Sequence, residues 1–438
     1  MLSRAAVIHR VVKAVPSTRY TQAEVKASFA PVFKAFHPSW TDAKWMESAF
    51  DNGGVKARHL IFDPASIRLP PKSFTDVSTD AFEKGLVLAK EATFKCFGED
   101  NKKNENKNKV LPELQPQDIN AVMGGSELAY GLSPDLFIHT GAPFRSNIMR
   151  PGFTRGFGCV GSATSLANAH RHLIAHPDHA LQILHVDAYS SQFEYGYQQL
   201  LVNPSDTLNT DKTMLRNLLV PAILLGDAAA AATLVGAKHR LFNTLVYDHG
   251  HPAILDSESF TLNGSRDGAP LLGYHTRGWG TMVYLTQDIP IAGATAIQIA
   301  LDQLLKRHNL KASDIAHWAM HPGGSPVLRL LQTPPSERKA FEHMRQFHGT
   351  FTEVSLDAKQ LAASWHILEN YGNCISPTLL MVLEQTLDTI PAATTPEYMI
   401  VAGVGPGLTA CVLLLKRFPM NSSPPPELSF SYTDDHML

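Results

Sequence analysis

The stretch at 156–164 reads GFGCVGSAT and places one cysteine among three glycines, directly ahead of an alanine-rich segment. The residues that follow, SATSLANAHRHLIAH, favour a helix that ends before Pro177. Cys159 therefore stands where a helix begins, and the unpaired N–H groups of a helix start stabilise a thiolate. Glycines on both sides let backbone or substrate approach the sulfur. An isolated cysteine is nonetheless more often a small buried hydrophobic residue, so the rest of the chain has to decide.

Helical and strand-like segments alternate on both sides of this stretch. Examples are the helical 82–96, the apolar 119–124 and 181–187, and the alanine-rich AAAATLVG, with the N-terminal MLSRAAVIHRVVKAVP as a first strand. After about residue 240 the pattern resumes with GTMVYL, TAIQIALDQLLKRHN, IAHWAM, AKQLAASWHILENY and a final pair around 398–415. This alternation indicates an α/β layered fold. We expect one compact unit of two similar halves, 1–240 and 241–417.

Two segments lie outside this pattern. GEDNKKNENKNK at 98–109 is polar and poor in aromatic residues, which predicts a solvated surface insertion near 98–113. The residues 418–438 are rich in proline and serine, which predicts a flexible tail. We expect neither segment to carry chemistry.

Composition excludes several classes of protein. The chain has 438 residues, 44% of them hydrophobic, which indicates a globular protein. Its 38 basic and 40 acidic residues give a formal charge of −2, and the absence of a basic block argues against nucleic-acid binding. Its cysteines lack CxxC spacing, which disfavours disulfides and structural zinc and favours a reducing, cytoplasmic location; they are Cys96, Cys159, Cys374 and Cys411. The apolar runs at 218–237 and 399–415 are interrupted by proline, aspartate or glycine, as buried strands are and membrane spans are not.

Two further turns carry polar side chains that suit a cleft. In IAHWAMHPGGSPVLRLL, His321 follows an apolar strand and precedes a helix that Ser325 would cap and Pro326 would open. In ASWHILENYGNCISPTLLMVLEQ, Asn373 lies between a helix that stops near Gly372 and a second helix. Either residue alone has an ordinary structural interpretation, because the chain holds 20 histidines and asparagine often satisfies helix ends in turns.

Taken together, these segments resemble the type III polyketide synthases, the chalcone-synthase-like branch of the thiolase-fold condensing enzymes. The resemblance runs from Lys56 to Lys416, and its signatures follow the family's order: the cysteine turn at 156–161, HPGG at 321–324, YGN at 371–373 and GVGPG at 403–407. The polar insertion and the divergence from plant members place the chain on the fungal or microbial side. The resemblance implies a thiolase-like fold of two αβαβα halves packed as one five-layered unit.

The resemblance also implies an activity and its catalytic residues. Cys159 matches the nucleophile, while His321 and Asn373 match the residues that hold the thioester oxygen and assist decarboxylation. A starter acyl group would pass from CoA to the cysteine, and malonyl-CoA would then extend it. We expect His321 to favour the Cys159 thiolate as an ion pair. CoA thioesters are the expected substrates, with no cofactor and no metal.

A pair of gate residues is expected at the mouth of the site. Leu225 in LLGDAA and Val283 in GTMVYL match the positions of a phenylalanine pair in plant enzymes, with Gly280 anchoring the second match. The alternative is that both are ordinary strand residues. Aliphatic gates predict aliphatic acyl starters and alkylpyrone or resorcinol products.

Other positions are expected to contact substrate. Gly405 and Pro406 belong to the GVGPG signature, and Lys56 and Arg58 in GGVKARHL fall where the family meets the CoA phosphates. Two cations so close together are otherwise usually a solvated face. The resemblance further implies a homodimer with an interface at ELAYGLSPDLFI, residues 127–138.

Rival interpretations remain. A ketoacyl synthase III-like fatty acid enzyme also uses Cys, His and Asn, but its family reads His-Gln-Ala-Asn where this chain reads HPGG. A non-catalytic thiolase-fold binding protein is disfavoured by the intact triad. No GxSxG elbow supports a serine hydrolase, and HRHLIAHPDH lacks the HExxH companion of a metalloenzyme.

Overall fold

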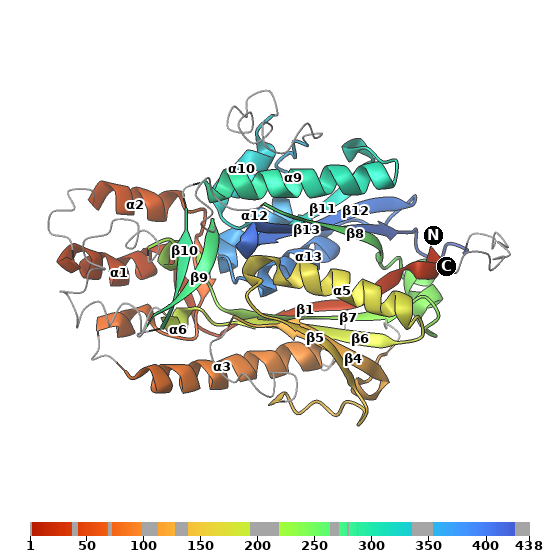
Figure 1. Cartoon of the computed structure of the whole chain (residues 1–438), viewed down its shortest axis with the longest axis horizontal. Helices are drawn as coiled ribbons and strands as arrows, with labels where there is room; N and C mark the ends of the chain where they lie inside the picture. Colours follow the sequence, from red (N-terminus) through yellow and green to blue (C-terminus); the bar gives the residue numbers. More distant parts are fainter. Residues whose placement is uncertain are drawn as a thin grey trace, which may run out of the picture.

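The computed structural model describes residues 2–36, 43–68, 72–98, 113–127, 139–192, 219–262, 271–277, 280–286, 288–334 and 354–424. The helices are α1 (Gln22–Phe36), α2 (Ala43–Asn52), α3 (Phe74–Lys95), α5 (Gly161–Ala175), α6 (Ser190–Gln192), α9 (Ile289–Arg307), α10 (Ser325–Gln332), α12 (Ala362–Tyr371) and α13 (Pro377–Thr389) (Figure 1). The strands are β1 (Ala6–Ala14), β2 (Arg19–Thr21), β3 (Ala57–His59), β4 (Ile119–Gly125), β5 (Met149–Thr154), β6 (Ala180–Asp187), β7 (Ala228–Gly236), β8 (Ala253–Thr261), β9 (Leu272–Arg277), β10 (Gly280–Leu285), β11 (Ile315–Met320), β12 (Glu397–Gly405) and β13 (Thr409–Arg417).

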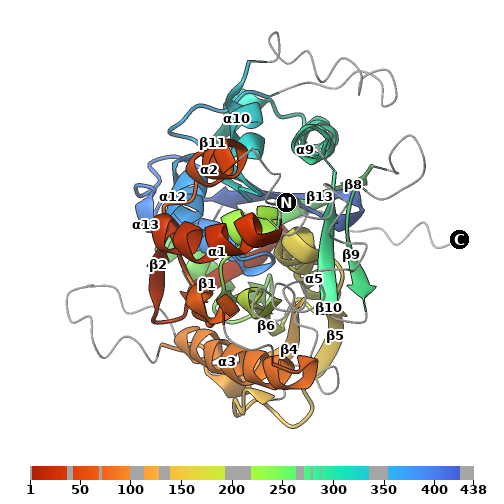
Figure 2. The ribbon, with the colours of Figure 1, turned by 90° about the vertical axis from the view of Figure 1, so that its left-hand side faces the viewer.

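The elements form the layers of a thiolase-like fold, as expected. Within the described residues, nine strands make one sheet in the order β11-β12-β13-β8-β1-β7-β6-β4-β5. The sheet wraps around a central layer of α5 and α13, while α3 covers one outer face and α9 the other (Figures 1 and 2). The protein is therefore α/β, with helices outside and between two sheet regions.

The strand order repeats outward from the middle of the sheet. β1 and β8 meet there through the pairs Ala6↔Ile254 and Val7↔Ala253. Outward from β1, the pairings with β7, β6 and β4 run antiparallel, antiparallel and parallel. Outward from β8, the pairings with β13, β12 and β11 follow the same sequence of directions. This repetition supports two similar halves, and the boundaries at 240 and 417 stay a prediction.

Small side chains allow the layers to come close. Every residue of β7, AAAAATLVG, is buried, and the strand contacts α3 on one face and both α5 and α13 on the other. Alanines on both faces of a strand leave room for helices on both sides. The central helix α5 likewise buries glycine, serine and alanine residues along much of its length.

The strands and helices expected at the sites of the motifs are confirmed. The N-terminal stretch forms β1, residues 399–415 fold into parts of β12 and β13 with the turn between them, and β7 occupies residues 228–236 of the run at 218–237. In the part of the chain that the structure describes, no helix is long and apolar enough to cross a membrane. Most of the insertion near 98–113 and of the tail lies outside the described residues.

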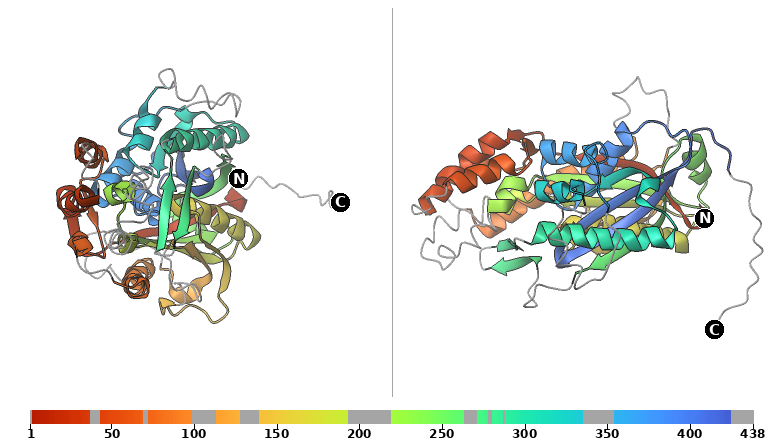
Figure 3. Two further views of the ribbon diagram at one scale, coloured as in Figure 1. Left: turned by 60° about the vertical axis from the view of Figure 1, so that its left-hand side comes forward. Right: turned by 90° about the horizontal axis from the view of Figure 1, so that it is seen from above.

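One end of the molecule gathers the elements that surround the cysteine turn. Helices α1 and α2 and the β9–β10 hairpin all lie at this end (Figures 1 and 3). The hairpin contacts α6 and the turn Pro406–Leu408 that follows β12. Residues from these peripheral elements therefore meet residues from the central layers at one place.

Candidate active site

Cys159 lies in a short 3-10 turn, Gly158–Val160, which leads directly into α5. The turn needs left-handed backbone at two glycines, with φ of +76° at Gly156 and +47° at Gly158, where a side chain would strain the chain. The sequence-based placement of Cys159 at a helix start is thus confirmed. Its partly exposed side chain faces the cavity described below.

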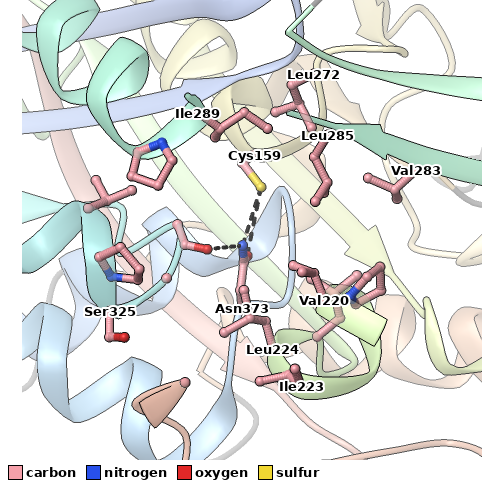
Figure 4. A pocket seen from close by; sticks show the side chains of 18 of the residues that line it. Cys159, Val220, Ile223, Leu224, Leu272, Val283, Leu285, Ile289, Ser325 and Asn373 are labelled. Atoms are coloured by element: carbon pink, nitrogen blue, oxygen red, sulfur yellow. Dashed lines mark hydrogen bonds between the residues drawn. The ribbon is translucent and has the colours of Figure 1, made fainter. Parts of the chain in front are cut away.

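Asn373 faces Cys159 from the turn between α12 and α13. Its Nδ2 donates to Cys159 Sγ at 3.5 Å and to the carbonyl oxygen of Gly323 at 3.1 Å (Figure 4). Its Oδ1 accepts from the backbone N–H of Ile375 at 2.9 Å and from Thr378 Oγ1 at 3.2 Å. Because a carbonyl can only accept, the amide orientation is determined, and its donor side points at the sulfur.

His321 follows β11 and is fully buried. Its backbone N–H donates to the carbonyl of Ala402 at 2.8 Å, which ties the turn to β12. Neither ring nitrogen has a hydrogen-bond partner among the described residues. Buried polar atoms without partners are rare and call for an explanation. His321 itself is not among the cavity-lining residues, although Gly323 and Gly324 of the same HPGG turn are.

The electrostatics oppose one expectation. Burial raises the pKa of the Cys159 thiol to about 12, against the lowering effect of the Asn373 hydrogen bond. Burial also lowers the pKa of His321 to about 3. Both shifts favour the neutral forms in the ligand-free site and so oppose the expected thiolate–imidazolium pair, which stays a prediction. The apolar surroundings outweigh the helix start.

The N-cap predicted at Ser325 is wrong. Gly324 occupies the N-cap of α10, and no side chain caps this helix. Ser325 Oγ instead donates to the carbonyl of Asn52 at 2.8 Å and so links α10 to the end of α2.

An apolar cavity of about 370 Å³ opens at Cys159 and Asn373. Val220, Ile223 and Leu224 form one wall, and Leu272 and Leu285 from the hairpin lie opposite (Figure 4). Further lining residues include Ala49, Asn52 and Gly53 at the end of α2, together with Ile289, Pro290, Pro326, Val327, Ile375, Val404 and Leu408. None of the described lining residues carries a charge. The cavity suits an uncharged, largely hydrocarbon group next to the thiol.

Leu225, Val283 and Pro406 also line this cavity. Leu225 forms an isolated β-bridge with Asn373, and Val283 lies in the hairpin strand β10. Both gate candidates are thus placed at the wall of the cavity, and their role as gates stays a prediction.

Gly405 and Gly280 do not line the cavity. Gly405 ends β12, and a Cβ there would lie 2.5 Å from the carbonyl oxygen of Phe157 and 2.6 Å from the nitrogen of Val160. The glycine thus lets β12 press against the cysteine turn. Gly280 opens β10 opposite Arg277.

Arg58 does not fit the expected phosphate contact. Its side chain is fully buried, and its guanidinium donates to the carbonyls of Ala222, Ile223 and Leu225 at 2.7, 2.6 and 3.1 Å, and to Gln22 Oε1. Since these bonds hold the cavity segment from inside, we correct the assignment of Arg58 to a structural role.

Lys56 is exposed and lies 2.7 Å from Glu369 Oε2. Its contact with CoA stays a prediction.

Sequence reasoning missed two carboxyl groups beside the cysteine turn. Glu127 accepts from the backbone N–H of Gly158 at 2.8 Å and of Gly156 at 3.2 Å. Asp187 is buried at the end of β6 and bonds to the backbone of Glu127. The available signal was an aspartate that closes the apolar run LQILHVD, because a carboxyl group at the end of a buried strand needs partners.

Comparisons with known proteins agree with this arrangement. Residues 266–419 match the family model described as chalcone and stilbene synthases, C-terminal domain. The 1,3,6,8-tetrahydroxynaphthalene synthase of Streptomyces peucetius subsp. caesius is 25% identical over 423 residues, 95% of this chain and 94% of that protein.

Solved structures share the fold. A fungal type III polyketide synthase, ORAS, superimposes with a TM-score of 0.71 at 18% identity, over 94% of this chain and 99% of that one. Germicidin synthase from Streptomyces coelicolor, also a type III polyketide synthase, superimposes with a TM-score of 0.71 at 18% identity, over 94% of this chain and 100% of that one.

The layered fold, with a cysteine at the start of a central helix, defines the protein as a thiolase-fold protein. Within that class, the chain is similar to the chalcone-synthase-like family, the type III polyketide synthases, and its residues 266–419 match the model of that family's C-terminal domain.

Proposed function

We propose that the protein is a condensing acyltransferase that loads an acyl starter from CoA onto Cys159, extends it with malonyl-CoA and releases a cyclised polyketide. One observation carries the proposal: the Cys159 thiol faces the Asn373 amide donor in the wall of a cavity whose described lining residues are uncharged. A nucleophile, an oxyanion donor and an apolar chamber for the growing chain are the parts that such a reaction needs.

Loading begins with the neutral thiol. Cys159 Sγ attacks the thioester carbonyl, the Sγ–C bond forms, the bond from carbon to the CoA sulfur breaks, and CoA leaves as its thiol. Because burial disfavours the free thiolate, the proton must leave the sulfur as the new bond forms. We propose that a ring nitrogen of His321, which is neutral and has no partner among the described residues, takes this proton and passes it to the departing CoA sulfur.

Extension begins with malonyl-CoA. Its carboxylate leaves as carbon dioxide, and the electron pair of the broken C–C bond becomes an enolate on the thioester oxygen. Asn373 Nδ2 donates to this oxygen, and His321 supplies the second donor once the substrate fills the site. The enolate carbon then attacks the acyl–Cys159 carbonyl, a C–C bond forms, and the Sγ–C bond breaks. The negative charge passes to Sγ, which takes up a proton from solvent and returns to the thiol. The chain, now two carbons longer, is carried on CoA.

The cavity walls support an aliphatic starter. Leu225, Val283 and the leucines beside them present branched alkyl groups rather than aromatic rings, so a hydrocarbon chain packs along them without a stacking partner. We propose medium or long acyl-CoA starters and alkylpyrone or resorcinol-type products.

We expect kcat/KM to rise steadily from acetyl-CoA through octanoyl-CoA and beyond, until the cavity is full. Each buried methylene stabilises the complex by about 0.8 kcal/mol, which corresponds to about fourfold per methylene. Val283→Phe should lower the rates of the longest starters most, because the ring occupies part of the chain's path. A panel of acyl-CoA starters with labelled malonyl-CoA, analysed by product mass, measures both effects.

Val87→Phe is the matched control, since Val87 on α3 is 63% exposed and outside the cavity lining. This variant should keep the chain-length profile of the unmodified protein. Coumaroyl-CoA as the best of all starters would contradict the aliphatic assignment, and labelled malonyl-CoA left unused with every starter would contradict the proposed activity itself.

We further propose a homodimer, as the family resemblance implies. The segment expected at the interface, 127–138, lies outside the described residues apart from Glu127. Light scattering at micromolar concentration should give about twice the chain mass of 48.0 kDa. A mass near that of one chain across the accessible concentrations would rule the dimer out.

A further inference from the structure

A buried carboxyl group lies between the two turns that carry Cys159 and Asn373. Asp187 is 1% exposed and ends β6, and the catalytic steps above assign it no task. Its hydrogen bonds lead in two directions, one toward each turn.

The first direction leads to the cysteine turn. Asp187 Oδ1 accepts from the backbone N–H of Glu127 at 2.7 Å. The side chain of Glu127 in turn accepts from the backbone N–H groups of Gly156 and Gly158, which flank the cysteine. Asp187 therefore fixes the backbone of a residue whose side chain holds the cysteine turn.

The second direction leads to the asparagine turn. Asp187 Oδ2 accepts from the backbone N–H of Ser376 at 2.9 Å and also from Ser376 Oγ. Ser376 is the N-cap of α13, and its own carbonyl accepts from Ser162 Oγ on α5. Three residues earlier in the same turn is Asn373, so the position of Ser376 sets where the asparagine amide points.

We propose that Asp187 is a positioning residue: its carboxyl group joins the Cys159 turn to the Asn373 turn and so holds the thiol and the amide donor in reacting geometry. The effect of Asp187 on catalysis rests on the proposed function. The hydrogen bonds by which it joins the two turns are present without substrate. Three donors converge on this one carboxyl group, and a side-chain carboxamide offers only one acceptor oxygen.

The surroundings give Asp187 a characteristic pH dependence. Burial and then the neighbouring Glu127 raise its pKa to about 8. The titratable groups near Asp187 are Glu127 and the thiols of Cys159 and Cys374. His185 lies two residues earlier on β6, and its ring and the Ser376 side chain both lie beside Gly161. An ionised Asp187 raises the pKa of the Cys159 thiol.

The test compares the unmodified protein with Asp187→Asn by two measurements. The first is the rate of Cys159 alkylation by iodoacetamide between pH 6 and 10. Below about pH 8 the two proteins should react at similar rates, because Asp187 is then protonated. Above this pH the variant should react faster, by about tenfold for each unit by which its thiol pKa is lower.

The second measurement is decarboxylation of malonyl-CoA above pH 8, where Asp187 is ionised and both of its oxygens accept. The rate should fall at least about tenfold in Asp187→Asn, because a carboxamide has one acceptor oxygen and the Asn373 turn loses its anchor. Asp178→Asn is the matched control, since Asp178 is exposed, and it should change neither measurement. If the unmodified protein decarboxylates no malonyl-CoA, the proposed function fails, whereas the alkylation profile still tests Asp187.

Ser376→Ala keeps the test decisive if Asp187→Asn does not fold. Loss of the Ser376 hydroxyl donor should lower decarboxylation and, because that hydrogen bond lowers the pKa of Asp187, move the Asp187-dependent part of the alkylation profile to higher pH. Full decarboxylation in Ser376→Ala, or alkylation profiles that coincide for a folded Asp187→Asn and the unmodified protein, would overturn the positioning role.

Discussion

Cys159→Ala is expected to abolish acyl loading and to lower polyketide formation at least about a thousandfold, because no other thiol can replace it. Cys96, Cys374 and Cys411 are buried, and none of the three lines the cavity. Intact-mass measurement after incubation with octanoyl-CoA should show one acyl group on the unmodified protein and none on the variant. Peptide mapping should place the group on Cys159.

Cys96→Ala provides the matched control, since it removes a buried thiol at the end of α3 and leaves the cavity intact. This variant should load the acyl group normally. Acyl transfer that survives in Cys159→Ala would sink the nucleophile assignment.

The same thiol should show a steep pH response. Because the pKa of Cys159 is raised to about 12 and that of His321 is lowered to about 3, the thiolate fraction increases with pH throughout the neutral range. Alkylation of the unliganded protein should therefore keep accelerating up to at least pH 9 without an earlier plateau. A plateau near neutral pH would restore the thiolate–imidazolium pair that the sequence predicts.

Asn373→Ala is expected to lower malonyl-CoA decarboxylation by a factor of about 100 to 1,000 while acyl loading persists. The variant lacks the Nδ2 donor that faces Cys159, and one oxyanion donor typically contributes about 3–4 kcal/mol to lowering the barrier. Carbon dioxide release and acyl-enzyme formation, measured side by side, separate the two steps.

The alanine variant also leaves the Gly323 carbonyl and the donors of Ile375 and Thr378 without their partner. Its thermal unfolding should therefore be measured in parallel. Asn373→Asp retains the acceptor for the two donors and loses the N–H that faces the sulfur, so it should lose decarboxylation as well.

Asn370→Ala serves as the control, because Asn370 bonds only locally, to the carbonyl of His366 on α12. Decarboxylation that is unchanged in a folded Asn373→Ala would contradict the donor role.

The local sequence pattern was sufficient to predict the main helices and strands and the turns that carry the motifs. Short apolar runs predicted strands such as β6 and β13, and longer segments rich in helix-forming residues predicted helices such as α5 and α9, because these preferences are local. Glycines marked the cysteine turn for the same reason, since left-handed φ is a local property.

Properties that depend on distant residues were predicted poorly. The sequence predicts that Arg58 contacts the CoA phosphates, but its side chain points inward to three carbonyls that lie more than 160 positions further along the chain. The ion pair of Cys159 and His321 was expected from residue types, whereas the protonation of each group depends on the apolar side chains that surround it. The carboxyl group of Asp187 went unnoticed because both groups of partners come from other elements.

The sequence by itself determined the α/β architecture, the family resemblance and the three turns that bear Cys159, His321 and Asn373, since each depends on residues close together in the chain. Only the tertiary structure decided that Asn373 points its donor at Cys159, that Leu225 and Val283 share one cavity, and that Asp187 joins two of the turns. The physical reason is that burial and hydrogen-bond direction arise when segments far apart in sequence pack together, and it is burial that sets the charge of the thiol.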